Sequence, residues 1–198
     1  MEFKRLADYF QELEKTSSRL EITRLLVSLF KEAKSSEIAK ICYLSLGQLA
    51  PLYEGIEFNL AEKMMIRVLA CVLDKSEEKI RTEFKRLGDF GEVIYGTNNK
   101  KRETKSFSVE EVYQRLWEIA QEKGTGSVER KIQQMAELIL DLDNLSAKYV
   151  VRIPVGKLRL GFSDLTILDA LSWMSVGDKS RRDEIETAFN VRADIGEI

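Results

Sequence analysis

Histidine is absent from the 198-residue sequence, and cysteine and proline occur only twice each. Without histidine the chain has no Ser-His or Cys-His nucleophile pair, and it lacks the commonest general base and metal ligand. Hydrolysis by a catalytic triad is therefore excluded. Cys42 and Cys71 lie among apolar residues, which predicts two reduced core side chains of an intracellular protein rather than a disulfide framework.

Long hydrophobic runs and an export signal are also lacking. No apolar run approaches the roughly 20 residues that a bilayer helix needs, and the charged segment 1–10 does not have the basic-then-apolar pattern of a signal peptide. We therefore expect a soluble, cytoplasmic protein without a membrane partner. Its 44% hydrophobic and 32% charged residues are typical of a globular chain, and its net charge of −2 does not by itself indicate a nucleic-acid partner.

Apolar residues recur three and four positions apart along most of the chain, and this spacing predicts amphipathic helices. The stripes cover residues 3–13, 22–30, 60–73, 109–120, 132–142 and 165–174. Residues that favour the start of a helix precede several of these stripes and two further predicted helices: Ser35, Asn59, Ser76, Ser108 and Ser163. The expected fold class is therefore all-α.

Residues 149–161 are the one stretch that departs from the helical pattern. Polar and apolar residues alternate there and several are β-branched, so a β-hairpin is the alternative interpretation. Pro154 disfavours that alternative because proline cannot donate to a strand ladder.

The two halves of the sequence resemble each other in three places that follow in the same order. Asp89-x-Gly91-Glu92 recurs as Asp194-x-Gly196-Glu197, Ala39-Lys40 with Gly47-x-Leu49 recurs as Ala147-Lys148 with Gly156-x-Leu158, and Glu14-Lys15 with Ser18 recurs as Glu122-Lys123 with Ser127. Matches at a nearly constant displacement predict an internal duplication. We expect a first helical lobe over residues 1–96, a polar basic connector over 97–107, and a second helical lobe over 108–198 that carries the main binding surface.

Basic residues are concentrated in one stretch of the second lobe. Residues 144–163 contain four cations, Lys148, Arg152, Lys157 and Arg159, and no acidic residue. In the segment 156–161 cations alternate with leucines between two glycines, which is suited to a tight loop that holds both cations outward. The matching segment of the first lobe, which begins at Gly47, has no cation. This difference indicates anion binding, and the alternative is that the cations only solvate a loop.

A second candidate anion site is the turn Gly124-Thr125-Gly126-Ser127, which opens a predicted helix containing Lys131. Free amides and the helix dipole favour an anion at such a position, although helix capping alone also explains the residues. A nucleotide-binding P-loop is excluded because the Gly-Lys-Ser/Thr ending is absent. Two phosphate-facing elements in one lobe predict sequence-independent binding to the backbones of duplex DNA.

The same residues match a known family over essentially the whole chain. The matching motifs are Ala147-Lys148-Tyr149 with Gly156-x-Leu158-Arg159-Leu160-Gly161, Gly124-x-Gly126-Ser127, Asp89-x-Gly91-Glu92, Tyr43-Leu44-x-x-Gly47-x-Leu49-x-Pro51 and Asp194-Ile195-Gly196. In combination they resemble the N-terminal DNA-binding domain of ATP-dependent DNA ligases, closest to the archaeal type.

The resemblance implies an all-helical, two-lobed module that grips the minor groove of nicked duplex DNA. Such a module serves DNA replication, repair and recombination, while further domains of the ligase carry out catalysis. The phosphate contacts that the resemblance implies are Thr125, Gly126, Ser127, Lys131, Gly156, Lys157, Arg159 and Gly161. We add Lys148 and Arg152 of the same basic stretch as candidate DNA-binding residues.

Two departures from the family pattern limit what this chain can do. The tetrapeptide Lys-x-Asp-Gly, whose lysine takes the AMP, does not occur in the 198 residues. We therefore expect no catalytic residue, metal site or cofactor in this chain, and we expect ATP and Mg²⁺ only in the full-length ligase. The segment 103–108, with Phe107, lacks the glutamine and the second aromatic residue of the family's sliding-clamp motif, which weakens the case for a clamp partner.

A different class of function also fits a duplicated helical chain. A helical-repeat scaffold would hold a partner protein in an apolar groove and would be indifferent to DNA. The two hypotheses differ in the surface that they require, because DNA needs a basic band and a peptide needs an exposed apolar groove. A third hypothesis, that the chain is itself an enzyme, has no supporting set of residues.

Overall fold

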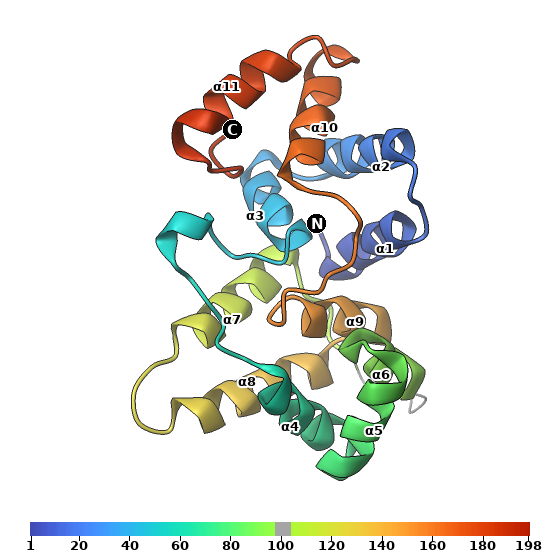
Figure 1. Ribbon diagram of the computed structural model, residues 1–198, viewed down its shortest axis with the longest axis vertical. Coiled ribbons are helices and arrows are strands. Elements are labelled where there is room, and N and C mark those ends of the chain that lie inside the picture. The colour runs from blue at the N-terminus through green and yellow to red at the C-terminus, as the bar shows by residue number, and fades with distance from the viewer. Residues whose placement is uncertain (98–103) are drawn as a thin grey trace.

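The computed structural model describes residues 1–97 and 104–198, and residues 98–103 of the predicted connector lie outside this description. The described residues form an all-α fold (Figure 1), which confirms the expected class. The helices are α1 (Phe3–Glu14), α2 (Arg19–Glu32), α3 (Ser35–Ser45), the 3-10 turn η1 (Leu52–Glu54), α4 (Glu62–Leu73), α5 (Glu77–Leu87), α6 (Phe90–Thr97), α7 (Val109–Gln121), α8 (Ser127–Asp141), α9 (Asn144–Arg152), α10 (Asp164–Val176) and α11 (Arg182–Arg192). In the described part of the chain, the only strand-like pairing is an isolated bridge between Glu2 and Ser108.

Side chains at the predicted helix starts cap the helices in two of the clearest cases. Ser76 Oγ accepts a hydrogen bond from the amide of Lys79 (3.4 Å). Ser108 Oγ accepts one from the amide of Glu111 (3.2 Å), whose carboxylate accepts the amide of Ser108 in return (2.7 Å). The predicted start at Asn59 is wrong. Its backbone is left-handed (φ +52°), a conformation that asparagine tolerates, so the chain turns there before α4 begins.

The first part of the stretch 149–161 is helical, and no hairpin forms in this described region. α9 is started by Asp143, whose carboxylate accepts the amides of Leu145 (3.0 Å) and Ser146 (3.2 Å). The apolar residues that suggested a strand, such as Val150, lie buried on α9. A helix cap that precedes the stretch therefore outweighed its β propensity.

Helices of the two predicted lobes pack against each other in pairs. α2 packs on α10, α4 on α8, α3 on α7 and α1 on α9. In the predicted duplication α2 corresponds to α8, α4 to α10, α3 to α9 and α1 to α7. The pair α2–α10 therefore corresponds to the pair α8–α4, and the pair α3–α7 corresponds to α9–α1. Figure 1 shows α2 with α10 and α11 at one end of the molecule and α8 with α4 and α5 at the other. The duplication stays a prediction, but segments 1–96 and 108–198 share one core and do not stand apart.

The two cysteines occupy different environments. Cys42 is buried, and burial raises the pKa of its thiol to about 12. Cys71 is exposed, so its predicted place in the core is wrong. The buried side of α4 is formed by residues such as Val68 and Leu69, which leaves Cys71 on the outer side. None of the helices described is long and apolar enough to cross a membrane.

Candidate nucleic-acid interface

The loop that follows α9 presents its cations as the sequence predicts. Leu158 and Leu160 are buried and anchor the loop. Lys157, which precedes the two leucines, and Arg159, which lies between them, are exposed. Gly156 (φ +63°) allows the left-handed turn that starts this segment. The alternation of leucine and cation therefore places two positive charges on the surface of a well-anchored loop.

The two cations of this loop are held differently. The Arg159 guanidinium donates from Nη2 to the carbonyl oxygen of Gly88 (2.7 Å), and its Nε lies 3.5 Å from the Asp89 carboxylate. Within the described residues the Lys157 ammonium has no ion-pair partner, while its backbone amide donates to the carbonyl of Arg152 (3.1 Å). Arg159 is thus a pinned, half-exposed cation, and Lys157 is a free one.

The turn before α8 has the backbone that a helix-end anion site needs. Gly124 (φ +84°) and Gly126 (φ +77°) are left-handed, and Gly126 is an N-cap without a side chain to occupy the first amides of α8. Arg130 folds back onto the turn, where it donates to the carbonyl of Thr125 (2.9 Å) and pairs with Glu122 (2.8 Å). The amide of Ser127 donates to the carbonyl of Gly124 (3.1 Å), so the first-turn amides that stay available to an anion are those of Val128 and Glu129. The neighbouring Arg130 charge is largely neutralised.

Lys131 was predicted as a phosphate contact and lies inside the fold. Its side chain is 6% exposed, and its ammonium donates to the carbonyls of Phe58 (2.7 Å) and Ala120 (3.3 Å). Burial lowers the pKa of this ammonium. In this structure Lys131 ties α8 to the segment before α4, and its charge does not face the surface.

Lys148 and Arg152, the other two predicted cations of the basic stretch, are also buried. Lys148 pairs with Glu14 (3.0 Å) and Glu92 (2.8 Å). Arg152 is 1% exposed and binds Asp89 through two hydrogen bonds, of 3.0 and 2.7 Å, and Glu14 through another of 3.0 Å. These two cations hold α1, α6 and α9 together.

The carboxylate of Glu14 shows how strongly this buried cluster is coupled. Burial by itself raises the pKa of Glu14, but hydrogen bonds from Arg152, Tyr149 and Lys148 outweigh it and lower the pKa to about 2. The Arg152 guanidinium binds three carboxylates through Nε and Nη2, whereas its buried Nη1 has no hydrogen-bond partner among the described residues. Removing a carboxylate partner from a buried cation is strongly destabilising. The cluster therefore fixes the end of α9, from which the exposed loop leaves.

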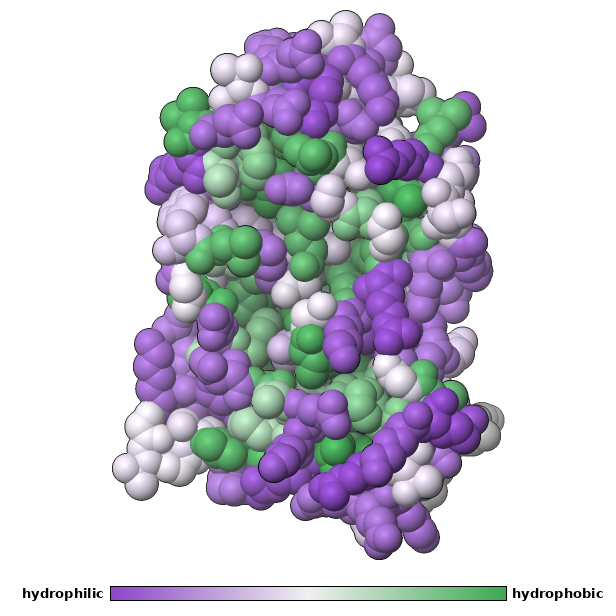
Figure 2. Space-filling model, viewed as in Figure 1, coloured by the Kyte–Doolittle hydropathy of each residue, from purple (hydrophilic) through white to green (hydrophobic). Residues whose placement is uncertain are grey.

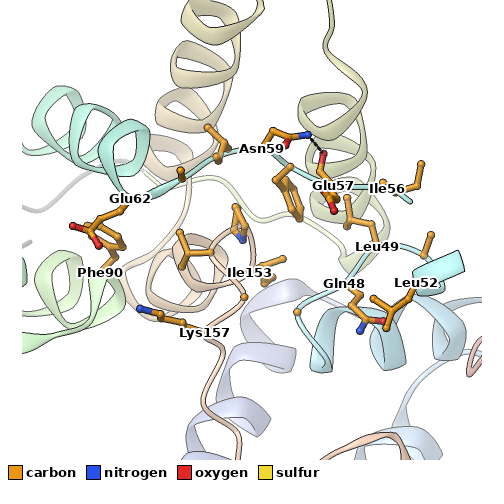
Figure 3. A pocket seen from close by; sticks show the side chains of 18 of the residues that line it. Gln48, Leu49, Leu52, Ile56, Glu57, Asn59, Glu62, Phe90, Ile153 and Lys157 are labelled. Carbon is orange, nitrogen blue, oxygen red and sulfur yellow. Dashed lines mark hydrogen bonds between the residues drawn. The ribbon is translucent and has the colours of Figure 1, made fainter. Parts of the chain in front are cut away.

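The turn and the loop lie along one band of the surface, because three hollows share lining residues. Gly124 and Ser127 of the turn line the first hollow together with residues 55–57 and Asn59. The segment 55–59, Gly156 and Lys157 line the second, and Gly156, Arg159 and Gly161 line the third. Figure 2 shows apolar side chains along the middle of one face with hydrophilic margins. In Figure 3, Lys157 and Glu62 mark one end of the middle hollow, and Leu52 and Ile56 mark the other.

Arg19 is a candidate that the sequence analysis did not identify. It is the first residue of α2, it is exposed, and it lines the third hollow together with Arg159. Its guanidinium forms no ion pair among the described residues. The signal was present in the sequence, because Ser18, which precedes α2, matches Ser127, the first residue of α8, in the predicted duplication.

Fold and surface together define an all-α domain with exposed cations and a helix-end turn along one face. The chain matches the family described as DNA ligase N terminus over residues 2–172. It is 44% identical over 200 residues to "Probable DNA ligase" of Dictyoglomus turgidum, and the aligned region covers 100% of this chain and 34% of that protein. It is 40% identical over 210 residues to "DNA ligase" of Sulfolobus acidocaldarius, with 100% and 35% covered.

"Probable DNA ligase" of Aquifex aeolicus is 40% identical over 201 residues, again across 100% of this chain and 34% of the relative. The chain therefore belongs to the DNA ligase N-terminal family, which confirms the resemblance seen in the sequence. It spans about a third of the length of the relatives that it matches.

Proposed function

We propose that this domain binds duplex DNA, including nicked DNA, through the sugar-phosphate backbones that border the minor groove. In this proposal it does so as part of an ATP-dependent DNA ligase of replication, repair and recombination. The observation that carries the proposal is the band formed by the turn 124–127 and the loop 156–161. Membership of the ligase family supports the same conclusion.

Within the band, different residues supply charge and close approach. Lys157 and Arg159 supply cations, and Arg19 at the start of α2 extends the charge along the third hollow. The amides of Val128 and Glu129, just after the turn, supply donors that need no side chain, which lets a phosphate approach the backbone closely. Contacts of this kind fix register on a duplex without reading its sequence.

The buried cations act indirectly in this proposal. Lys131 holds α8 against the chain before α4, and Lys148 and Arg152 hold α9 against α1 and α6. Their charges are matched by carbonyls or carboxylates inside the fold, so they contribute little to the field at the surface. Their task is to keep the turn and the loop in a fixed relation.

Catalysis belongs to other parts of the ligase in this proposal, and so do ATP and Mg²⁺. Among the residues described, no group of three or more Cys, Asp or Glu residues is arranged to hold a metal ion. Phe107, the residue that matches the clamp motif, is half-buried, and the Arg115 guanidinium lies 4.5 Å from the centre of its ring. Its backbone carbonyl accepts a hydrogen bond from the amide of Phe3 (2.8 Å). We therefore propose no clamp contact through Phe107 and name DNA and the ligase's own catalytic domains as partners.

The alternative, a scaffold for a protein partner, has one observation in its favour. Leu52 is 80% exposed and Tyr53 is 52% exposed, and Leu52 lies at the end of the middle hollow (Figure 3). Apolar side chains at the end of this hollow could contact either a peptide or the deoxyribose groups of DNA. The choice between the two is made by a DNA titration.

The test is a fluorescence-anisotropy titration of a labelled nicked duplex at two salt concentrations, with two unrelated sequences. We expect equal affinity for both sequences and a steep loss of affinity with salt, because phosphate contacts release counterions. Replacing both Lys157 and Arg159 by Ala should reduce the logarithmic salt slope by about 2. Lys31→Ala, which removes one exposed cation outside the three hollows, is the single-charge control and should leave the slope unchanged. A double variant that binds like its parent would refute the proposed interface.

A further inference from the structure

Two aspartates at matching places in the predicted duplication each tie a helix to the loop that follows that helix. Asp194 accepts hydrogen bonds from the hydroxyls of Tyr43, which lies in α3, and of Tyr53 (3.1 Å), which lies in the segment after α3. Asp89 accepts two hydrogen bonds from Arg152 of α9 (3.0 and 2.7 Å) and lies 3.5 Å from Arg159 in the loop after α9. We call each aspartate with the side chains that it binds a corner. The Asp194 corner contains two tyrosines, and the Asp89 corner contains two arginines.

The glycine two residues after each aspartate has the same role in both corners. The Asp89 carboxylate accepts the amide of Gly91 (2.7 Å), and the Asp194 carboxylate accepts the amide of Gly196 (2.9 Å). A Cβ on Gly91 would lie 2.4 Å from Nε of Arg152, and one on Gly196 would lie 2.4 Å from the hydroxyl of Tyr43. Each glycine therefore lets the helix side chain lie directly over the corner.

Asp89 contacts Arg159 of the loop directly and is connected to Lys157 through Arg152. Arg152, held by Asp89, accepts the backbone amide of Lys157 on its own carbonyl (3.1 Å). Arg159 has a left-handed backbone (φ +61°), which is uncommon for a residue with a side chain, and its guanidinium is fixed between Asp89 and the carbonyl of Gly88. A cation fixed in advance loses less freedom when it meets a phosphate.

We propose that Asp89 is a positioning residue for DNA binding. From inside the fold it holds Arg159, and through Arg152 it holds the backbone at Lys157, so that both cations face the duplex without Asp89 touching it. The inference rests on the proposed function. Asp194, which binds tyrosines at the matching corner, positions no cation of this loop and is the internal control.

The experiment compares Asp89→Asn with Asp194→Asn in nicked-duplex titrations. We expect Asp89→Asn to weaken binding about tenfold and Asp194→Asn to change it less than about twofold, although both lower the melting temperature. In an Arg159→Ala background, Asp89→Asn should cost much less than in the parent, because the two substitutions remove one shared interaction. Equal losses in the two Asn variants, or full additivity with Arg159→Ala, would overturn the proposal.

Two further measurements keep the proposal testable whatever the first experiment gives. If Asp89→Asn does not fold, Arg159→Lys retains the charge but not the fork that spans Asp89 and Gly88, and we expect affinity to fall about fivefold. Parent-like binding by Arg159→Lys would then overturn the proposal. Hydrogen exchange across residues 153–161 needs no ligand, and it should accelerate in Asp89→Asn but not in Asp194→Asn. Unchanged exchange refutes the positioning role, whereas a parent that ignores duplex DNA refutes the proposed function.

Discussion

Tyr149 of α9 donates its hydroxyl hydrogen to the Glu14 carboxylate of α1 across 2.8 Å, and the two residues are 135 positions apart in the sequence. The contact lies in the cluster that also contains Lys148 and Arg152. It joins the first helix of the chain to the helix that carries the exposed loop. Stability of the fold and presentation of the loop are therefore linked at this carboxylate.

Glu14 should contribute stability that is lost in acid. Its pKa in the fold is about 2, below the ordinary value of 4.5, so its contribution is present above pH 4.5 and disappears as the pH falls from 4.5 towards 2. We expect Glu14→Gln to lower the free energy of unfolding at pH 7 by about 3 kcal/mol. Urea unfolding of both proteins between pH 7 and pH 2 measures this difference. A difference that stays constant down to pH 2 would contradict the low pKa.

Lys131→Met separates a structural lysine from a phosphate contact. The substitution leaves the carbonyls of Phe58 and Ala120 without their buried donor, and we expect a loss of about 1–3 kcal/mol in the free energy of unfolding. Because the ammonium does not face the surface, the salt slope of DNA binding should stay at the parent value. Thermal unfolding and salt-dependent titrations of the same samples supply both readings. Unchanged stability with a salt slope reduced by about 1 would restore Lys131 as a direct contact.

Arg19→Ala tests whether the proposed DNA surface extends to α2. The exposed guanidinium lines the same hollow as Arg159, so its removal should lower the salt slope by about 1 on any duplex sequence. Stability should change little, because the side chain has no ion-pair partner among the described residues. Lys31→Ala, near the other end of α2, removes the same charge outside the hollows. If both variants bind DNA equally well, the interface ends at the loop 156–161.

Two glycines of α6 should respond in opposite ways to the same substitution. In Gly91→Ala the new methyl group would meet Arg152 Nε at 2.4 Å and the carbonyl of Lys148 at 2.8 Å, and we expect a loss of about 1–3 kcal/mol. In Gly96→Ala nothing lies within 4 Å of the new atom, so the higher helix propensity of alanine should stabilise the protein by up to about 1 kcal/mol. Chemical unfolding of the two variants checks this. Equal effects would show that Gly91 is not closely packed.

Most of the helices could be predicted from the sequence because their signals are local. The apolar spacing of residues 109–120 and the cap at Ser108 lie within a few positions of each other, and both are confirmed. The failure at Asn59 is also local, since a left-handed residue can precede a helix without capping it.

The burial of three predicted cations could not be foreseen. Arg152 reads as one member of a basic stretch, yet its carboxylate partners Glu14, Asp89 and Glu92 lie 138, 63 and 60 positions away. Only the packing of α9 on α1 and α6 brings these acids to it. Counting charges along the chain therefore identified the loop. It did not distinguish the exposed cations Lys157 and Arg159 from the buried cations Lys148 and Arg152, which hold α9 in place.

The pairing of α2 with α10 and of α4 with α8 has a mechanical consequence. Each of these pairs joins a helix of segment 1–96 to a helix of segment 108–198. Rotation of one segment against the other would therefore have to separate both pairs at once. We expect the domain to behave as a single rigid body, so that under the proposed function a double helix must already match its contour or bend to do so. Distortion, where it occurs, would then fall on the nucleic acid rather than on the protein.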